Sequence, residues 1–205
     1  MRTQKQTSRQ AGFTILELLI ATSVFSMVLL LCATAVVQVG QIFYKGVTIN
    51  RTQDTARKAA DDIIQAIQFG TAGSPFKSET ITGNVHQLCL GNTRYTVTFN
   101  QSLGTDTGQA AHVVWKDRVS IANCSTAALG NGQELLGQNM RVKDFSVTQQ
   151  GDTWKVVVTI AYGKTDDLFI KNGDGSYNYG QCIFRNQGGQ FCAVSSITSY
   201  VAKRL

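Results

Sequence analysis

The hydrophobic pattern divides the chain into a long apolar segment near its start and a mixed body behind it. In residues 15–39 nearly every position is apolar, and a helix of that length extends roughly 37 Å at 1.5 Å per residue. This is longer than the hydrocarbon core of a bilayer, which is about 30 Å thick. The pattern therefore predicts one membrane-spanning helix followed by one soluble domain.

The residues behind the apolar segment predict that the helix continues beyond the membrane. In residues 52–69 the apolar positions recur with helical spacing, and polar residues fill the other side. The apolar positions are Ala56, Ala60, Ile63, Ile64 and Ile67. Gly70, Gly73 and Pro75 are typical of the end of a helix. We therefore expect an amphipathic helix that packs its apolar face against the body.

After this helix the pattern changes to the alternation typical of β-strands. Residues 93–100 and 112–119 are predicted strands, and residues 140–149 and 154–162 predict a long antiparallel hairpin. The hairpin residues expected to face the core are Val142, Phe145, Val147, Val156, Val158 and Ile160. The sequence thus predicts an α+β fold, in which the second half of a long N-terminal helix packs on an antiparallel β-sheet.

Charge is unevenly distributed around the apolar segment. The net charge is +6, and Arg2, Lys5 and Arg9 precede the segment without an acidic residue among them. Basic residues flanking a span predict that the N-terminus is cytoplasmic and that the body lies outside. The basic residues of the body are scattered rather than clustered, which predicts a solvated surface instead of a nucleic-acid-binding face. They include Arg94, Lys116, Arg118, Arg141 and Lys143.

Five cysteines are present, of which Cys32 lies in the apolar segment and Cys89, Cys124, Cys182 and Cys192 lie in the body. An even number behind a membrane anchor predicts two disulfides in an oxidising compartment. Three pairings are open. The pairing of Cys89 with Cys124 and of Cys182 with Cys192 is favoured because each pair brackets one local unit.

Candidate metal ligands and catalytic motifs are sparse. Zinc is disfavoured because there is no C-x-x-C and the two histidines lack ligand spacing. A weak calcium candidate consists of Asp166, Asp167, Asn172 and Asp174, although their spacing is not that of an EF-hand and Asn-Gly-Asp-Gly is also an ordinary turn sequence. The usual hydrolase, metalloprotease and P-loop motifs are missing, so the sequence predicts a protein without enzymatic activity or cofactor.

Three cleavage schemes compete at the N-terminus. A secretory signal peptide would be cut behind the apolar segment, where residues 33–35 read Ala-Thr-Ala. A lipoprotein would be cut before Cys32, but the preceding Leu31 is too large. The third scheme cuts ahead of the apolar segment, between Gly12 and Phe13.

Glu17 favours the third scheme. A carboxylate in a membrane-spanning helix costs about 2.5–3.5 kcal/mol at the bilayer centre, and a removable signal peptide gains nothing from it. A cut before Phe13 creates an α-amine one helical turn from Glu17. In a low dielectric such a pair is much stronger than in water.

Residues 12–21, Gly-Phe-Thr-Ile-Leu-Glu-Leu-Leu-Ile-Ala, resemble the signature of type IV prepilins, which include pilins and the pseudopilins of secretion and competence systems. The resemblance implies a pilin fold with four segments. These are a basic leader at 1–12 that is removed, a transmembrane and assembly helix at 13–44, its amphipathic continuation at 45–70, and an extracytoplasmic β-rich head with disulfides at 71–205.

The resemblance also implies a role for each matching residue. Prepilin peptidase would cut between Gly12 and Phe13 and would methylate the amine of Phe13. Glu17 would guide docking into the filament by pairing with the N-terminus of a neighbouring subunit. The implied partners are the peptidase, other pilin or pseudopilin subunits and, before assembly, the cytoplasmic membrane; after assembly the protein would lie in a filament at the cell surface.

The chain departs from many major pilins in one respect, since residues 13–74 contain no proline to bend the helix. This favours a minor subunit over a main filament subunit. The late long hairpin and the size of the body resemble those of minor pilins and pseudopilin J-like subunits. Two alternatives remain open on the sequence. One is a DNA-capturing pilin, and the other is a single-pass surface-binding protein that never polymerises.

Overall fold

The computed structural model describes residues 12–70, 76–104, 109–120, 122, 124, 128–184 and 188–202. Residues 1–11 of the expected leader lie outside this described part, as do the expected helix-ending residues Gly73 and Pro75. The chain divides into two compact units, Met1–Ile42 and Phe43–Leu205, and each is described by itself.

The first unit consists of the beginning of helix α1 (Ile15–Gln68). Its apolar side chains are exposed along the whole of residues 15–39. Its hydroxyl groups donate to carbonyl oxygens of the preceding turn, as Ser23 does to Ile20 at 2.9 Å and Thr34 to Leu31 at 2.9 Å. In the described part of the chain, this one helix is long and apolar enough to cross a membrane. The predicted helix is confirmed.

In the second unit, the last turns of α1 pack on the β-strands. The buried positions of α1 are Thr52, Ala56, Ala59, Ala60, Ile63 and Ile67. Three of these six are alanines, whose small side chains allow the strands to approach the helix closely. The predicted apolar face is therefore correct apart from Ile64, which is only partly buried at the edge of the core.

Strands β1 to β5 form an antiparallel sheet in sequential order. Gly132 in the last of these strands is needed for close packing, since an added Cβ would lie 2.1 Å from the carbonyl oxygen of Lys116. The strands are β1 (Phe76–Thr82), β2 (Val85–Leu90), β3 (Thr93–Thr98), β4 (Val114–Arg118) and β5 (Gly132–Glu134).

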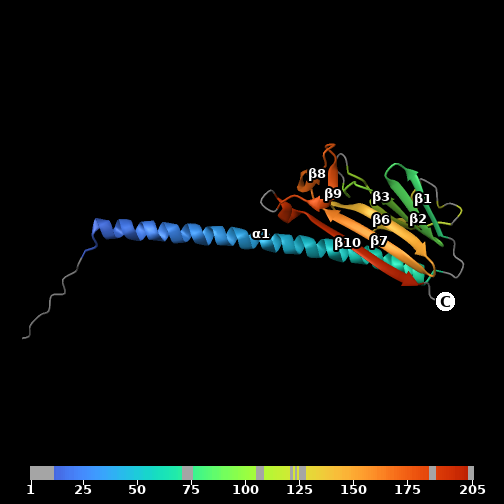
Figure 1. Cartoon of the computed structure of the whole chain (residues 1–205), viewed down its shortest axis with the longest axis horizontal. Coiled ribbons are helices and arrows are strands. Elements are labelled where there is room, and N and C mark those ends of the chain that lie inside the picture. Colours follow the sequence, from blue (N-terminus) through green and yellow to red (C-terminus); the bar gives the residue numbers. More distant parts are fainter. Residues whose placement is uncertain are drawn as a thin grey trace, which may run out of the picture. The chain divides into compact units, whose positions relative to one another are not determined.

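A second sheet is formed in the order β10-β7-β6, and Figure 1 shows its strands alongside the last turns of α1. The hairpin of β6 and β7 is the predicted one, and Gly151 turns it with a φ of +61°. A third, two-stranded sheet pairs β8 with β9. The strands are β6 (Met140–Gln150), β7 (Thr153–Tyr162), β8 (Phe169–Lys171), β9 (Tyr177–Cys182) and β10 (Ala193–Ala202).

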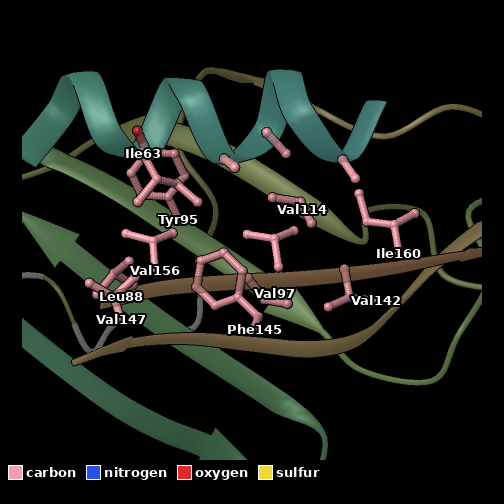
Figure 2. Packing of buried hydrophobic residues seen from close by; sticks show 14 of the residues in the cluster. Ile63, Leu88, Tyr95, Val97, Val114, Val142, Phe145, Val147, Val156 and Ile160 are labelled. Carbon is pink, nitrogen blue, oxygen red and sulfur yellow. The ribbon is translucent and has the colours of Figure 1, made fainter. Parts of the chain in front are cut away.

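The two larger sheets share one hydrophobic core beneath α1. Figure 2 shows Val97 and Val114 of the first sheet in the same layer as Val142 and Phe145 of the second, with the helix on one side. The two sheets are separate, and an isolated bridge between Phe99 and Val142 links them. Beyond it the amides of Asn100 and Leu103 donate to the carbonyl oxygens of Val142 and Met140. The α+β fold class is confirmed, with two larger sheets behind the helix in place of the single expected sheet.

Two disulfides hold the head together, and they join the cysteines that the sequence favours as pairs. Cys89 is bonded to Cys124 with Cα atoms 6.1 Å apart, and Cys182 is bonded to Cys192 with Cα atoms 5.8 Å apart. Cys32 is free and exposed on the apolar part of α1.

A buried ion pair lies next to the first disulfide. Cys89, Arg94 and Asp117 are direct cross-strand neighbours on β2, β3 and β4. Arg94 donates to both carboxylate oxygens of Asp117, from Nε at 2.9 Å and from Nη2 at 2.5 Å, and both side chains are fully buried. Arg94 also donates to the carbonyl of Ala128, while the amide of Gly130 donates to Asp117. The pair therefore holds the connection between β4 and β5 over this face of the sheet.

Candidate functional site

The helix begins immediately behind the expected cleavage junction. Thr14 caps α1, because its Oγ1 accepts a hydrogen bond from the amide of Glu17 at 3.2 Å and its carbonyl accepts one from the amide of Leu18 at 3.2 Å. Threonine followed three residues later by glutamate is the capping-box pattern. The cap places the first helical residue at Ile15 and leaves the bond between Gly12 and Phe13 outside the helix.

The junction residues are open to a partner. Phe13 is 84% exposed, and Gly12 is exposed as well. A Cβ added to Gly12 would meet no heavy atom within 4 Å in the described part of the chain, and its φ is outside the left-handed region. The described part of the fold therefore does not require glycine at position 12.

Glu17 is the one charged residue of residues 13–44. It lies in the first turn of α1 and is exposed. In the uncut chain the nitrogen of Phe13 is an uncharged amide. Cleavage would make it an amine four positions before Glu17, close enough for an ion pair within one helix turn or between neighbouring helices.

Thr14 is the helix cap that the hydrophobic pattern alone does not identify. The pattern of apolar residues begins at Ile15 and says nothing about how the first turn is capped. The signal was available in the sequence, since Thr14 and Glu17 have capping-box spacing directly ahead of an apolar run.

A second contact site lies where α1 meets the C-terminal disulfide loop. The Nζ of Lys45 donates to the carbonyl oxygens of Gly189 at 2.9 Å and Cys192 at 2.5 Å. Partial burial lowers the pKa of the Lys45 ammonium from its ordinary value. The ring of Tyr44 lies 6.0 Å from that of Phe191, so α1 holds the loop at two consecutive residues.

The expected calcium ligands Asp166, Asp167, Asn172 and Asp174 each hydrogen-bond to another side chain. Hydrogen bonds to Ser176 hold the pKa of the Asp174 carboxyl below its ordinary value. Within the described residues, no three or more His, Cys, Asp or Glu side chains are grouped so as to hold a metal ion. The partners are Arg141 for Asp166, Tyr177 for Asp167, and Ser176 for both Asn172 and Asp174.

The basic residues of the head do not support DNA binding. Arg94 is fully buried and Arg141 is 1% exposed, which corrects the expectation that both lie on a solvated surface. Arg141 is enclosed by the rings of Phe169 and Tyr179 and pairs with Asp166. Two cations are thus unavailable to phosphate groups because carboxylates and aromatic rings already surround them.

Comparison with known proteins gives one match. The family described as the prokaryotic N-terminal methylation motif matches residues 7–33, which include the junction, the cap and Glu17. Searches of curated proteins and of solved structures found no match for this chain.

Proposed function

This chain belongs to the type IV prepilin and pseudopilin family, and on that premise we propose that it is a structural subunit that polymerises through α1 into a pilus or pseudopilus. As a member it is a pilin-like substrate of prepilin peptidase. One observation carries the proposal furthest, namely the position of Glu17. Glu17 is the single charge of residues 13–44, which include the exposed apolar part of α1, and it lies one turn after an accessible junction.

Processing is proposed at the bond between Gly12 and Phe13, followed by methylation of the Phe13 amine. Support comes from the Thr14 cap, which keeps this bond out of the helix. Further support comes from the open space around Gly12. The described fold does not require a glycine there, whereas a peptidase that binds the junction closely would.

Assembly is proposed to pair Glu17 of one subunit with the Phe13 amine of a neighbour. Residues 15–39 expose apolar side chains that a bilayer covers before assembly and that neighbouring helices would cover afterwards. A pair of opposite charges in an apolar filament core favours the one register in which the two charges meet. The subunit would wait in the cytoplasmic membrane with its N-terminus inside, as Arg2, Lys5 and Arg9 indicate.

We further propose a minor, pseudopilin J-like subunit rather than the main subunit. Helix α1 runs from Ile15 to Gln68 and its sequence contains no proline. Proline is the usual cause of a sharp bend in a helix, and this helix lacks the proline that many major pilins carry there.

Replacing Gly12 by valine is expected to stop processing and to leave a full-length precursor in the membrane. The change adds a branched side chain beside the bond to be cut, where the chain itself offers open space. Mass spectrometry of the N-terminus checks this, and the unchanged protein should begin with a methylated Phe13.

Gly46→Val is the matched control, because Gly46 is also exposed and without a neighbour within 4 Å in the described part of the chain. It should be processed normally. A mature chain that begins at any residue other than Phe13 would contradict the proposed processing site. Normal processing of Gly12→Val would show that the peptidase does not recognise this glycine.

A further inference from the structure

Exposed aromatic side chains gather at the end of the Phe43–Leu205 unit where α1 enters it. We call Phe43, Tyr44, Phe184 and Phe191 the aromatic patch; they are 66%, 57%, 76% and 48% exposed. The ring of Tyr44 lies 6.2 Å from that of Phe43 and 6.0 Å from that of Phe191. Large exposed aromatics on a soluble domain indicate contact with a partner.

Phe184 and Phe191, the two members of the aromatic patch from the C-terminal disulfide loop, are attached to α1 through that loop. Lys45 donates to the carbonyl oxygens of Gly189 and Cys192, and the disulfide from Cys192 to Cys182 closes the loop. The amide of Gly189 donates to the carbonyl oxygen of Phe184 at 3.1 Å. Phe184 is therefore held near the level of residues 44–45 on α1.

The short distance along α1 between the apolar segment and Tyr44 places residues 44–45 at a membrane surface. Tyr44 follows Val39, the last residue of the apolar segment, by five positions in one continuous helix, which is about 7.5 Å along the axis. The polar headgroup layer extends about 5–8 Å beyond the hydrocarbon core on each side. Amphipathic aromatic residues concentrate in this layer at the ends of membrane spans.

We propose that the aromatic patch rests in the headgroup layer of the membrane while the subunit awaits assembly, so that a lipid surface is the partner of this face. The inference rests on the membrane-stored state in the proposed function. Lipid is favoured over a second protein because the patch continues directly from the membrane-spanning segment. Entry into a filament would then require the patch to leave the lipid.

The test places single tryptophans in the full-length chain, with Trp115 and Trp154 replaced by phenylalanine. The chain is reconstituted in phosphatidylcholine vesicles whose lipids carry bromine near the headgroup. We expect the emission of Phe184→Trp to shift to shorter wavelength and to be quenched. Tyr200→Trp is the matched control, because Tyr200 is similarly exposed at 63% but lies near the far end of β10, which runs away from the entry of α1 (Figure 1).

A third position, Phe25→Trp near the middle of the apolar segment, reports through the blue shift of its emission whether the anchor itself is in the membrane. If Phe25→Trp is blue-shifted while Phe184→Trp behaves like Tyr200→Trp, the patch does not touch lipid, although membrane anchoring stands. If Phe25→Trp is not blue-shifted, the membrane-stored state fails and the inference fails with it. A blue shift of Phe184→Trp that disappears when the protein is diluted into excess lipid would show that a second copy covers the patch, and would overturn the proposal.

Discussion

Replacing Glu17 by alanine is expected to leave a processed subunit in the membrane and to remove it from filaments. The change deletes the one charge of residues 13–44, so it makes the helix better suited to lipid and less suited to ordered assembly. Processing should continue, because the Thr14 cap depends on the backbone amide of Glu17 and not on its carboxylate.

The size of the effect follows from the dielectric of the filament core. An ion pair at 4 Å contributes about 4 kcal/mol when the effective dielectric constant is about 20. Losing about 3 kcal/mol of net stabilisation lowers an association constant on the order of 100-fold. Glu17→Ala should therefore be scarcely detectable in sheared surface filaments while its membrane level is unchanged, as immunoblotting of the two fractions would measure.

Two control variants separate charge from size and position. Glu17→Gln keeps the length of the side chain and should assemble as poorly as alanine, because it cannot pair with an amine as an anion. Asp61→Ala removes an exposed carboxylate from the head part of the same helix and should assemble normally. Normal co-purification of Glu17→Ala with other pilin subunits would contradict the assembly role and would favour a surface-binding protein that does not polymerise.

The long helix and the β6–β7 hairpin could be predicted from the sequence because the apolar residues of each recur with one dominant period. The helical spacing that predicts a buried face in residues 52–69 agrees with burial of Ala56, Ala60, Ile63 and Ile67. The hairpin was equally clear, and all six of its predicted core residues are buried. A β-bulge between Val142 and Asp144 explains why Phe145, rather than Asp144, faces the core after Val142.

Strands whose residues are buried without a regular alternation could not be predicted from the sequence. β1 and β10 are edge strands, each paired on one side only among the described strands. β10 contains four Ser or Thr residues, and its alternation carries little hydrophobic contrast. The position of β10 is set by its antiparallel pairing with β7, which the β-propensities of its residues do not predict.

The N-terminal residues of the site were predictable from local sequence, whereas its long-range contacts were not. Gly12, Phe13, Thr14 and Glu17 are neighbours in the chain, so spacing alone identifies them. Lys45 lies far from Gly189 and Cys192 in sequence, and nothing in their residue types predicts that an ammonium meets two carbonyls. Burial of a charge depends on partners that only the folded chain brings together.

The ion pair of Arg94 and Asp117 is another contact that only the folded chain brings together, and it should contribute strongly to the stability of the head. Replacing Asp117 by alanine is expected to destabilise the head by about 3–5 kcal/mol, because it leaves the guanidinium of Arg94 buried without its counter-charge. The amide of Gly130 loses its acceptor as well. Urea unfolding of the full chain in detergent, followed by head tryptophan fluorescence, measures the change.

An exposed pair provides the matched control for this variant. Asp54 and Lys58 are 2.6 Å apart on α1, with side chains 62% and 74% exposed. Asp54→Ala should change stability by about 0.5 kcal/mol or less, since solvent screens such a pair. A loss in Asp117→Ala no larger than in Asp54→Ala would contradict a stabilising role for the buried pair.

The double variant Arg94→Met with Asp117→Leu should recover part of the loss but not all of it. Removing both charges ends the penalty of a lone buried ion, and apolar residues of similar size often replace such pairs without cost. Here, however, Ala128 and Gly130 would keep backbone groups that have lost their side-chain partners. Full recovery would show that the pair does not hold the connection between β4 and β5.

The contribution of Asp117 to the free energy of unfolding should decrease at low pH. Burial alone raises the pKa of the Asp117 carboxyl, but hydrogen bonds from Arg94 and Gly130 and the charge of Arg94 outweigh it and hold the pKa below 3.8. A carboxyl whose pKa is lower in the folded state adds stability that is fully present above its unfolded pKa, and that is lost as the pH falls through its folded value. The difference in unfolding free energy between the unchanged chain and Asp117→Ala should therefore be constant from about pH 7 to about pH 5 and should shrink below about pH 4. A difference that stays constant into acid would mean that Asp117 stabilises the head as a hydrogen-bonding group rather than as a charge.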